Sequence, residues 1–93
     1  MSNTESIKPP KGTNVSKLDL DMEFNTLMDE VAEMFKQKQY LRNWNQELFV
    51  SKVPIARSTL LEVLSGKGNP TVKSVLAIAM SLGYKIEINL VRK

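Results

Sequence analysis

The 93-residue chain contains no cysteine and no histidine, and each absence removes a class of chemistry. Without cysteine the chain can form no disulfide and has no thiolate nucleophile, which agrees with a reducing compartment. Without cysteine and histidine it also lacks the usual zinc and copper ligands and the commonest general base. We therefore expect a protein that is not an enzyme, carries no metal or other cofactor, and has no implied small-molecule ligand.

Long apolar runs are missing as well. No stretch of about 18 consecutive apolar residues is present, and the N-terminus lacks the basic-then-apolar plan of a signal peptide. These features predict a cytoplasmic protein with no membrane partner. A length of 93 residues leaves room for one domain, and a net charge of +3 with a pI near 9.3 favours an anionic partner such as DNA.

The chain divides into three parts by the spacing of its apolar residues. Residues 1–18 have isolated apolar residues and a Pro9-Pro10 pair, and they predict a flexible N-terminal arm. Residues 19–83 have helical periodicity and form the predicted domain. Residues 84–93 alternate apolar and polar side chains and then end in basic residues, which predicts a strand and a basic tail.

Apolar residues recur at steps of three and four in the first part of the domain, the spacing of one helix face. Phe24, Val31 and Phe35 belong to this series and predict a helix over residues 21–38. Acidic residues gather in its early turns and lysines in its last turns, as the helix dipole favours. Four methionines at helical spacing are expected in the core: Met22, Met28, Met34 and Met80.

Two short helices follow. Asn45 is placed as the N-cap of a helix over residues 46–52, with Trp44 packed on Phe49 as a hydrophobic staple. Because proline disfavours helical geometry at the residue before it, Pro54 ends that helix. The next helix is predicted over residues 57–64, with an inward stripe of Leu60, Val63 and Leu64.

The last predicted helix lies between Thr71, which can cap its start, and Gly83, which can end it. The glycine-rich residues 65–70 before it form a turn. Five of its apolar residues are expected to be buried: Val72, Val75, Leu76, Ala79 and Leu82.

The C-terminal residues Tyr84 to Val91 alternate with period two, which is typical of a strand. A lone strand is not stable in water, so it must pair with another one. The same strand of a second subunit is the simplest supplier, with Ile86, Ile88 and Leu90 in the dimer interface. The predicted fold is a small all-α bundle of four to five helices with a C-terminal β-strand paired across a dimer.

The stretch from Gln46 to Leu60, followed by the residues Ser65-Gly66-Lys67-Gly68-Asn69-Pro70-Thr71, resembles the Cro-type, lambda-repressor-like (XRE) helix-turn-helix family without a gap. About forty residues carry the resemblance. The segment ARSTLLEVLSGKGNPTVKSVLAIAMSLGYKIEI is most similar to HigA-type antidote proteins of toxin-antitoxin modules, which show the order R-S-T-L, S-G-x-G-N-P-T and L-G.

The resemblance implies that the helix over residues 57–64 enters the major groove of DNA. Arg57 can then pair with guanine or a phosphate, Leu61 can touch a thymine methyl, and Glu62 can accept from cytosine or repel phosphates. Gln46 corresponds to the phosphate-contacting glutamine of the family. The DNA-binding residues implied in this way are Gln46, Arg57, Ser58, Thr59, Leu61, Glu62, Ser65, Lys67 and Asn69.

Two positions depart from the family pattern. The family usually has glycine where this chain has Pro54, and proline cannot adopt the positive φ that favours glycine there. The family also usually has alanine where this chain has Val50. These departures predict a local difference in the turn and in the spacing of the two helices.

Three functions remain open from the sequence. The first is a homodimeric, sequence-specific DNA-binding repressor that acts on a palindromic operator. The second is an antitoxin that neutralises a partner toxin and autoregulates its operon, motivated by the resemblance to antidote proteins. The third is a protein-interaction adaptor that has lost DNA binding, motivated by Pro54, Leu61 and Glu62.

Overall fold

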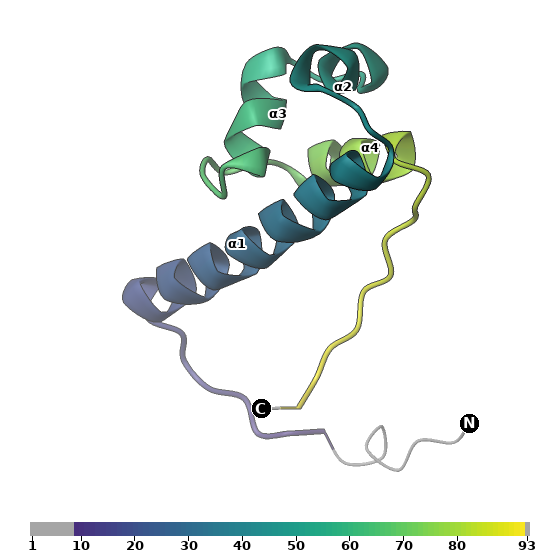
Figure 1. The fold of residues 1–93 in the computed structure, drawn as a ribbon. Coiled ribbons are helices and arrows are strands. Elements are labelled where there is room, and N and C mark those ends of the chain that lie inside the picture. Colours follow the sequence, from purple (N-terminus) through teal and green to yellow (C-terminus); the bar gives the residue numbers. More distant parts are fainter. Residues whose placement is uncertain (1–8, 93) are drawn as a thin grey trace, which may run out of the picture.

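The computed structural model describes residues 9–92, which fold into four α-helices (Figure 1). Their bounds are α1 (Lys17–Leu41), α2 (Gln46–Lys52), α3 (Arg57–Leu64) and α4 (Val72–Ser81). The expected all-α class is confirmed for this part of the chain. None of the helices in residues 9–92 contains an apolar stretch that could span a bilayer.

The longest helix, α1, extends beyond its predicted bounds at both ends. It begins at Lys17 because the Ser16 hydroxyl caps it by accepting a hydrogen bond from the backbone N–H of Asp19, at 3.1 Å. It continues to Leu41, and the chain then reverses through Asn43, whose φ is 58°. The predicted arm over residues 1–18 therefore loses its last two residues to α1, and its first eight lie outside the described residues.

The three short helices have the predicted starts and stops. The Asn45 side chain accepts from the backbone N–H of Leu48 at 2.8 Å, and the rings of Trp44 and Phe49 lie 5.8 Å apart, so the predicted cap and staple are both present. The Thr71 hydroxyl caps α4 through the N–H of Ser74 at 3.1 Å. Gly83 follows α4 with a φ of +94°, a conformation that glycine adopts without strain.

One hydrophobic core lies where α1 meets the three short helices. The side chains of Phe49, Leu60 and Ile78 are fully buried there, one from each short helix. The other buried core residues are Met28, Ala32, Phe35, Val53, Val63, Ala79 and Leu82. Figure 1 shows α2 and α3 on one side of α1, while the segments before α1 and after α4 leave on the other side.

Several expectations about burial are wrong. Val72 is 72% exposed and Leu76 is 36% exposed, because α4 turns Ile78, Ala79 and Leu82 toward the core. This helix is apolar around most of its circumference, so periodicity alone did not identify its buried face. Of the four methionines expected in the core, only Met28 is buried there.

The C-terminal residues after Gly83 form no strand within residues 84–92. Ile86 is half-buried and packs against the core, whereas Ile88 and Leu90 are exposed. The backbone N–H of Tyr84 donates to the carbonyl of Ala79 at 2.9 Å, which anchors the start of this segment. The predicted pairing of this segment with a second subunit stays a prediction, because a pair between subunits involves a second chain.

Candidate functional site

The pair of helices α2 and α3 is joined by the short connection of residues 53–56. The backbone N–H of Ile55 donates to the carbonyl of Val53 at 2.9 Å, which tightens this connection. Proline can occupy position 54 because no residue of this connection has a positive φ. Among the described non-glycine residues, only Asn43 has a positive φ. Val50 is half-buried and packs against the core at the inner side of α2.

Helix α3 has a buried face and an exposed polar face. Leu60 and Val63 anchor it in the core, and the exposed residues Ser58, Glu62 and Ser65 lie on its outer side. The remaining predicted site residues on this helix, Thr59 and Leu61, are half-buried. Leu61 is therefore less available to a thymine methyl than an exposed residue would be.

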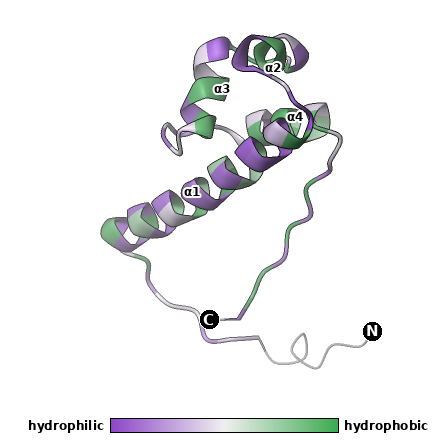
Figure 2. Cartoon of the chain, viewed as in Figure 1, coloured by the Kyte–Doolittle hydropathy of each residue, from purple (hydrophilic) through white to green (hydrophobic). Residues whose placement is uncertain are grey.

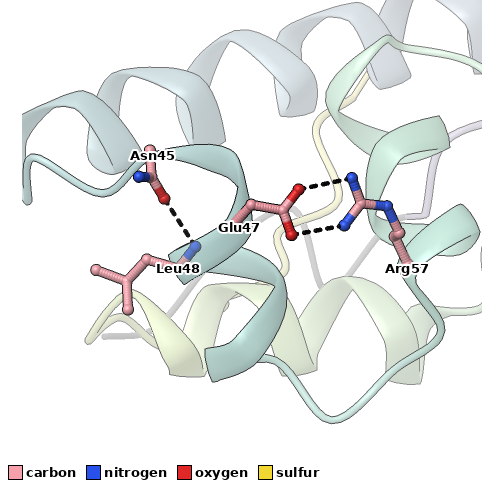
Figure 3. A network of polar contacts seen from close by, with 4 residues as sticks. All are labelled: Asn45, Glu47, Leu48 and Arg57. Atoms are coloured by element: carbon pink, nitrogen blue, oxygen red, sulfur yellow. Dashed lines mark hydrogen bonds and ion pairs between the residues drawn. The ribbon is translucent and has the colours of Figure 1, made fainter.

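At its N-terminal end, α3 is tied to α2 by an ion pair between Arg57 and Glu47 (Figure 3). The two Nη atoms of Arg57 donate to the two carboxylate oxygens of Glu47 at 3.0 Å and 2.9 Å, a bidentate arrangement. The hydrogen bonds and the charge of Arg57 lower the pKa of Glu47 below its ordinary value of 4.5, and Glu47 raises the pKa of Arg57 in the same way. Both side chains remain accessible to solvent, so the pair can still meet a ligand.

At its C-terminal end, α3 runs into the glycine-rich turn. The Ser65 hydroxyl and the backbone N–H of Lys67 both donate to the carbonyl of Glu62, each at 2.9 Å. A Cβ atom on Gly68 would lie 2.8 Å from a carboxylate oxygen of Glu62, so this carboxylate lies directly over the turn. Gly66 and Gly68 have φ values of +74° and +80°, which only glycine adopts readily.

The predicted DNA-binding residues thus fall into groups at the two ends of α3. Arg57 stands at one end with Glu47, and exposed Gln46 precedes Glu47 at the start of α2. The other end brings together Glu62, Ser65, Lys67 and Asn69, of which Lys67 and Asn69 are exposed in the turn. The site residues around α3 carry charges of both signs. The cations are Arg57 and Lys67, and the carboxylates are Glu47 and Glu62.

Glu47 is the site residue that sequence reasoning missed. It is ten positions before Arg57, and no periodicity links two residues that lie on different helices. The charges of the two residues could have indicated the pair. Glu47 lies in the first turn of α2 and Arg57 in the first turn of α3, and side chains of opposite charge at these places can pair across a tight connection.

Comparison of the chain with models of protein families, with curated proteins and with solved structures found no match in any of the three. Within residues 9–92, no group of three or more histidine, cysteine, aspartate or glutamate side chains is placed to hold a metal ion.

Proposed function

We propose that the protein is a sequence-specific DNA-binding regulator in which α2 and α3 form a helix-turn-helix unit and α3 enters the major groove. The observation that carries the proposal is the placement of α3, which is anchored in the core by Leu60 and Val63 and turns a polar outer face to solvent. An α-helix fits the major groove of B-DNA, where each base pair shows a distinct pattern of donors and acceptors. The arrangement is consistent with the resemblance of residues 46–71 to the lambda-repressor-like family.

The residues of the two ends then have different tasks. Arg57 uses two of its five N–H groups on Glu47 and keeps the others for guanine or a phosphate. Ser58 on the outer face can bond to base edges. Lys67 and Asn69 in the turn can contact phosphates, which positions the protein without reading sequence.

The proposed regulator is a homodimer whose interface includes Ile86, Ile88 and Leu90 of the C-terminal segment. Ile88 and Leu90 are exposed and available for this contact, while Ile86 packs partly against the core of its own chain. If the dimer is twofold symmetric, its operator is palindromic, with half-sites one or more helical turns apart. A strand from each subunit would then pair across the twofold axis.

The test is a binding titration on a DNA duplex selected by the protein, comparing wild type with Arg57→Ala. Loss of one phosphate or base contact is expected to weaken binding clearly. Lys17→Ala is the matched control, because Lys17 also forms an exposed ion pair, with Asp21, but at the far end of α1. Equal effects of the two substitutions would contradict docking through α3.

A second candidate function is neutralisation of a partner toxin, and the exposed apolar side of α4 favours it. Val72, Leu76 and Met80 recur every four residues along this helix, and Leu76 and Met80 line a surface pocket together with Pro54. Such a patch is typical of a protein-binding surface. Co-expression with the product of the neighbouring gene, followed by purification, tests this function, and Met80→Glu is expected to reduce co-elution.

The third function, an adaptor that does not bind DNA, is favoured by the carboxylates of Glu47 and Glu62 beside and on α3. The dependence of DNA affinity on salt distinguishes an adaptor from a DNA-binding protein. A protein that neutralises Z phosphates loses DNA affinity with a log-log slope near roughly −0.9Z, whereas an adaptor shows no salt-dependent DNA affinity.

A further inference from the structure

Three cations gather where the C-terminal ends of α1, α2 and α4 meet. Lys38 and Arg42 lie one turn apart at the end of α1, and Lys52 is the last residue of α2. The guanidinium carbon of Arg42 lies 5.2 Å from the centre of the Trp44 ring, and the ammonium group of Lys52 lies 5.7 Å from it. The ammonium group of Lys38 lies 4.8 Å from the centre of the Tyr84 ring, in the segment after α4. We call Lys38, Arg42 and Lys52 the basic cluster.

Hydrogen bonds between the helix ends hold the basic cluster in place. Nε of Arg42 donates to the carbonyl of Leu82 at 2.9 Å, which ties the end of α1 to the end of α4. A Cβ atom on Gly83 would lie 2.7 Å from Nη2 of Arg42, so the missing side chain lets the guanidinium lie against the backbone. The Ser81 hydroxyl lies 3.1 Å from the carbonyl oxygen of Lys52, which ties the end of α4 to the end of α2. The three cations therefore belong to one surface.

No carboxylate pairs with the basic cluster within residues 9–92. Figure 2 shows the last turns of α1 in the colours of hydrophilic residues, and lysine and glutamine alternate there. The carboxylates nearest to the cluster along the chain have other cations as partners: Glu33 pairs with Lys36, Glu47 with Arg57, and Glu87 with Lys85. The other described carboxylates lie on α3 or at least two helical turns before Lys38 on α1.

The helix ends offset only part of the charge of the basic cluster. Lys38 and Lys52 lie in the last turns of α1 and α2, and Arg42 bonds to the carbonyl at the end of α4. Each helix C-terminus carries a partial charge of roughly −0.5, so three ends offset about half of the charge of three cations. The rest is left uncompensated, and Lys38 and Arg42 repel each other because they are one turn apart. An anionic ligand would relieve this repulsion.

Two features of the surroundings favour an acidic protein segment over a nucleic acid as this ligand. Nucleic acid single strands bind by stacking bases on aromatic rings, but cations already lie over the rings of Trp44 and Tyr84, and Trp44 also packs on Phe49. Figure 1 shows the ends of α1 and α4 on the side of the molecule away from α3, so the basic cluster faces away from a duplex held by α3. Carboxylates can bind here through charge-assisted hydrogen bonds from the two ammonium groups and from the Nη atoms of Arg42.

We propose that the basic cluster is a docking surface for an acidic segment of a partner protein, whose Asp and Glu carboxylates meet Lys38, Arg42 and Lys52. The proposal goes beyond DNA binding and does not depend on it, because the basic cluster and the outer face of α3 lie on different sides of the molecule. A partner docked here leaves α3 open to DNA.

The test uses Trp44, the only tryptophan in the chain, as a reporter. Because Arg42 and Lys52 both lie over its ring, a carboxylate that binds them is expected to change its emission. The probe is a labelled synthetic peptide of alternating Asp and Glu without aromatic residues, and a Gln peptide of the same length is the uncharged control. We expect the acidic peptide alone to change the emission in a saturable way, with an affinity that falls as salt screens the exposed charges.

A double variant locates the peptide. Lys38→Gln with Lys52→Gln removes two cations and keeps Arg42, which holds the end of α4. Its affinity for the acidic peptide is expected to fall by about tenfold, because each exposed ion pair contributes at most a factor of about five. The matched control is Lys11→Gln with Lys73→Gln, which makes the same change in net charge before α1 and at the start of α4. This control is expected to bind the peptide nearly as tightly as wild type does.

The remaining outcomes would overturn the proposal. Equal losses of affinity in the two double variants would show attraction by net charge alone. Peptide binding seen by anisotropy with no response from Trp44 would place the peptide elsewhere. Tighter binding of a single-stranded oligonucleotide, lost in Lys38→Gln with Lys52→Gln, would assign the basic cluster to phosphates.

The proposed DNA binding is tested separately. Arg57→Ala is expected to weaken DNA binding and to leave peptide binding unchanged, whereas Lys38→Gln with Lys52→Gln is expected to do the reverse. Failure of docking through α3 therefore leaves the basic cluster standing as a binding surface, and failure of peptide binding leaves docking through α3 intact.

Discussion

Replacing Glu47 by glutamine removes the carboxylate that holds Arg57 through hydrogen bonds of 3.0 Å and 2.9 Å. The substitution takes one negative charge away from the start of α3 and leaves Arg57 with a neutral neighbour. If α3 docks on DNA, Arg57 then becomes free to neutralise one further phosphate. We therefore expect Glu47→Gln to bind duplex DNA more tightly than wild type at low salt.

The size of the effect follows from counterion release. One additional phosphate contact steepens the slope of log K against log salt by about 0.9. Between 50 and 200 mM salt, a fourfold range, the affinity of Glu47→Gln should therefore fall by roughly 3.5 times more than the affinity of wild type. Arg57→Ala removes the guanidinium altogether, so its slope is expected to be shallower than that of Glu47→Gln by about 0.9 or more.

The assay is fluorescence anisotropy of a labelled duplex at four or five salt concentrations, with thermal unfolding as a check on the fold. In the background of Arg57→Ala, the Glu47→Gln substitution should have a much smaller effect, because the carboxylate acts mainly through the guanidinium. If the slopes are the same in wild type, Glu47→Gln and Arg57→Ala, the Arg57–Glu47 pair lies away from the phosphates and the predicted contact does not exist.

Three further predictions concern the fold that presents α3. Asn45→Ala removes the acceptor for the N–H of Leu48 and should lower the free energy of unfolding by about 1 kcal/mol in a urea titration, while Asn45→Asp should retain most of it. Phe49→Ala removes a fully buried ring and should lower the free energy of unfolding by about 3–5 kcal/mol, a large part of the stability of so small a domain. Met80 is exposed, so Met80→Ala should lower the free energy of unfolding only slightly. The pKa of Glu47 is lowered in the folded protein, so the ionised carboxylate stabilises the fold at neutral pH. This contribution is lost as the pH falls below about 4.5, the pKa in the unfolded chain, and through the lower pKa of the folded protein. On acidification, wild type should therefore lose more stability than Glu47→Gln.

The sequence predicted well those helix boundaries that are marked by a capping side chain, a proline or a glycine. Asn45 and Thr71 carry side chains that cap a helix, Pro54 cannot continue one, and Gly83 adopts the positive φ that follows a helix end. Each of these effects is local, so it can be read from a few neighbouring residues. The start of α1 was missed although the same chemistry is present, because the cap formed by Ser16 lies inside a stretch that otherwise has the composition of an arm.

The features that the sequence did not predict depend on how the helices meet. The buried face of α4 is set by contact with the other helices, which selects Ile78 over Val72. The Arg57–Glu47 pair depends on the angle between α2 and α3, which neither helix encodes alone. The exposed positions of Met34 and Leu41 depend on where the short helices cover α1 and where they leave it bare.

DNA binding through α3 is tested most directly by selecting binding sites from a random pool of DNA duplexes with the purified protein and then titrating salt on the enriched sequence. We expect a twofold-symmetric site whose half-sites are one or more helical turns apart. Its affinity for the protein should fall steeply with salt and be reduced in Arg57→Ala. A pool that shows no enriched sequence, with no salt-dependent binding, would contradict docking through α3 and would direct attention to a protein partner.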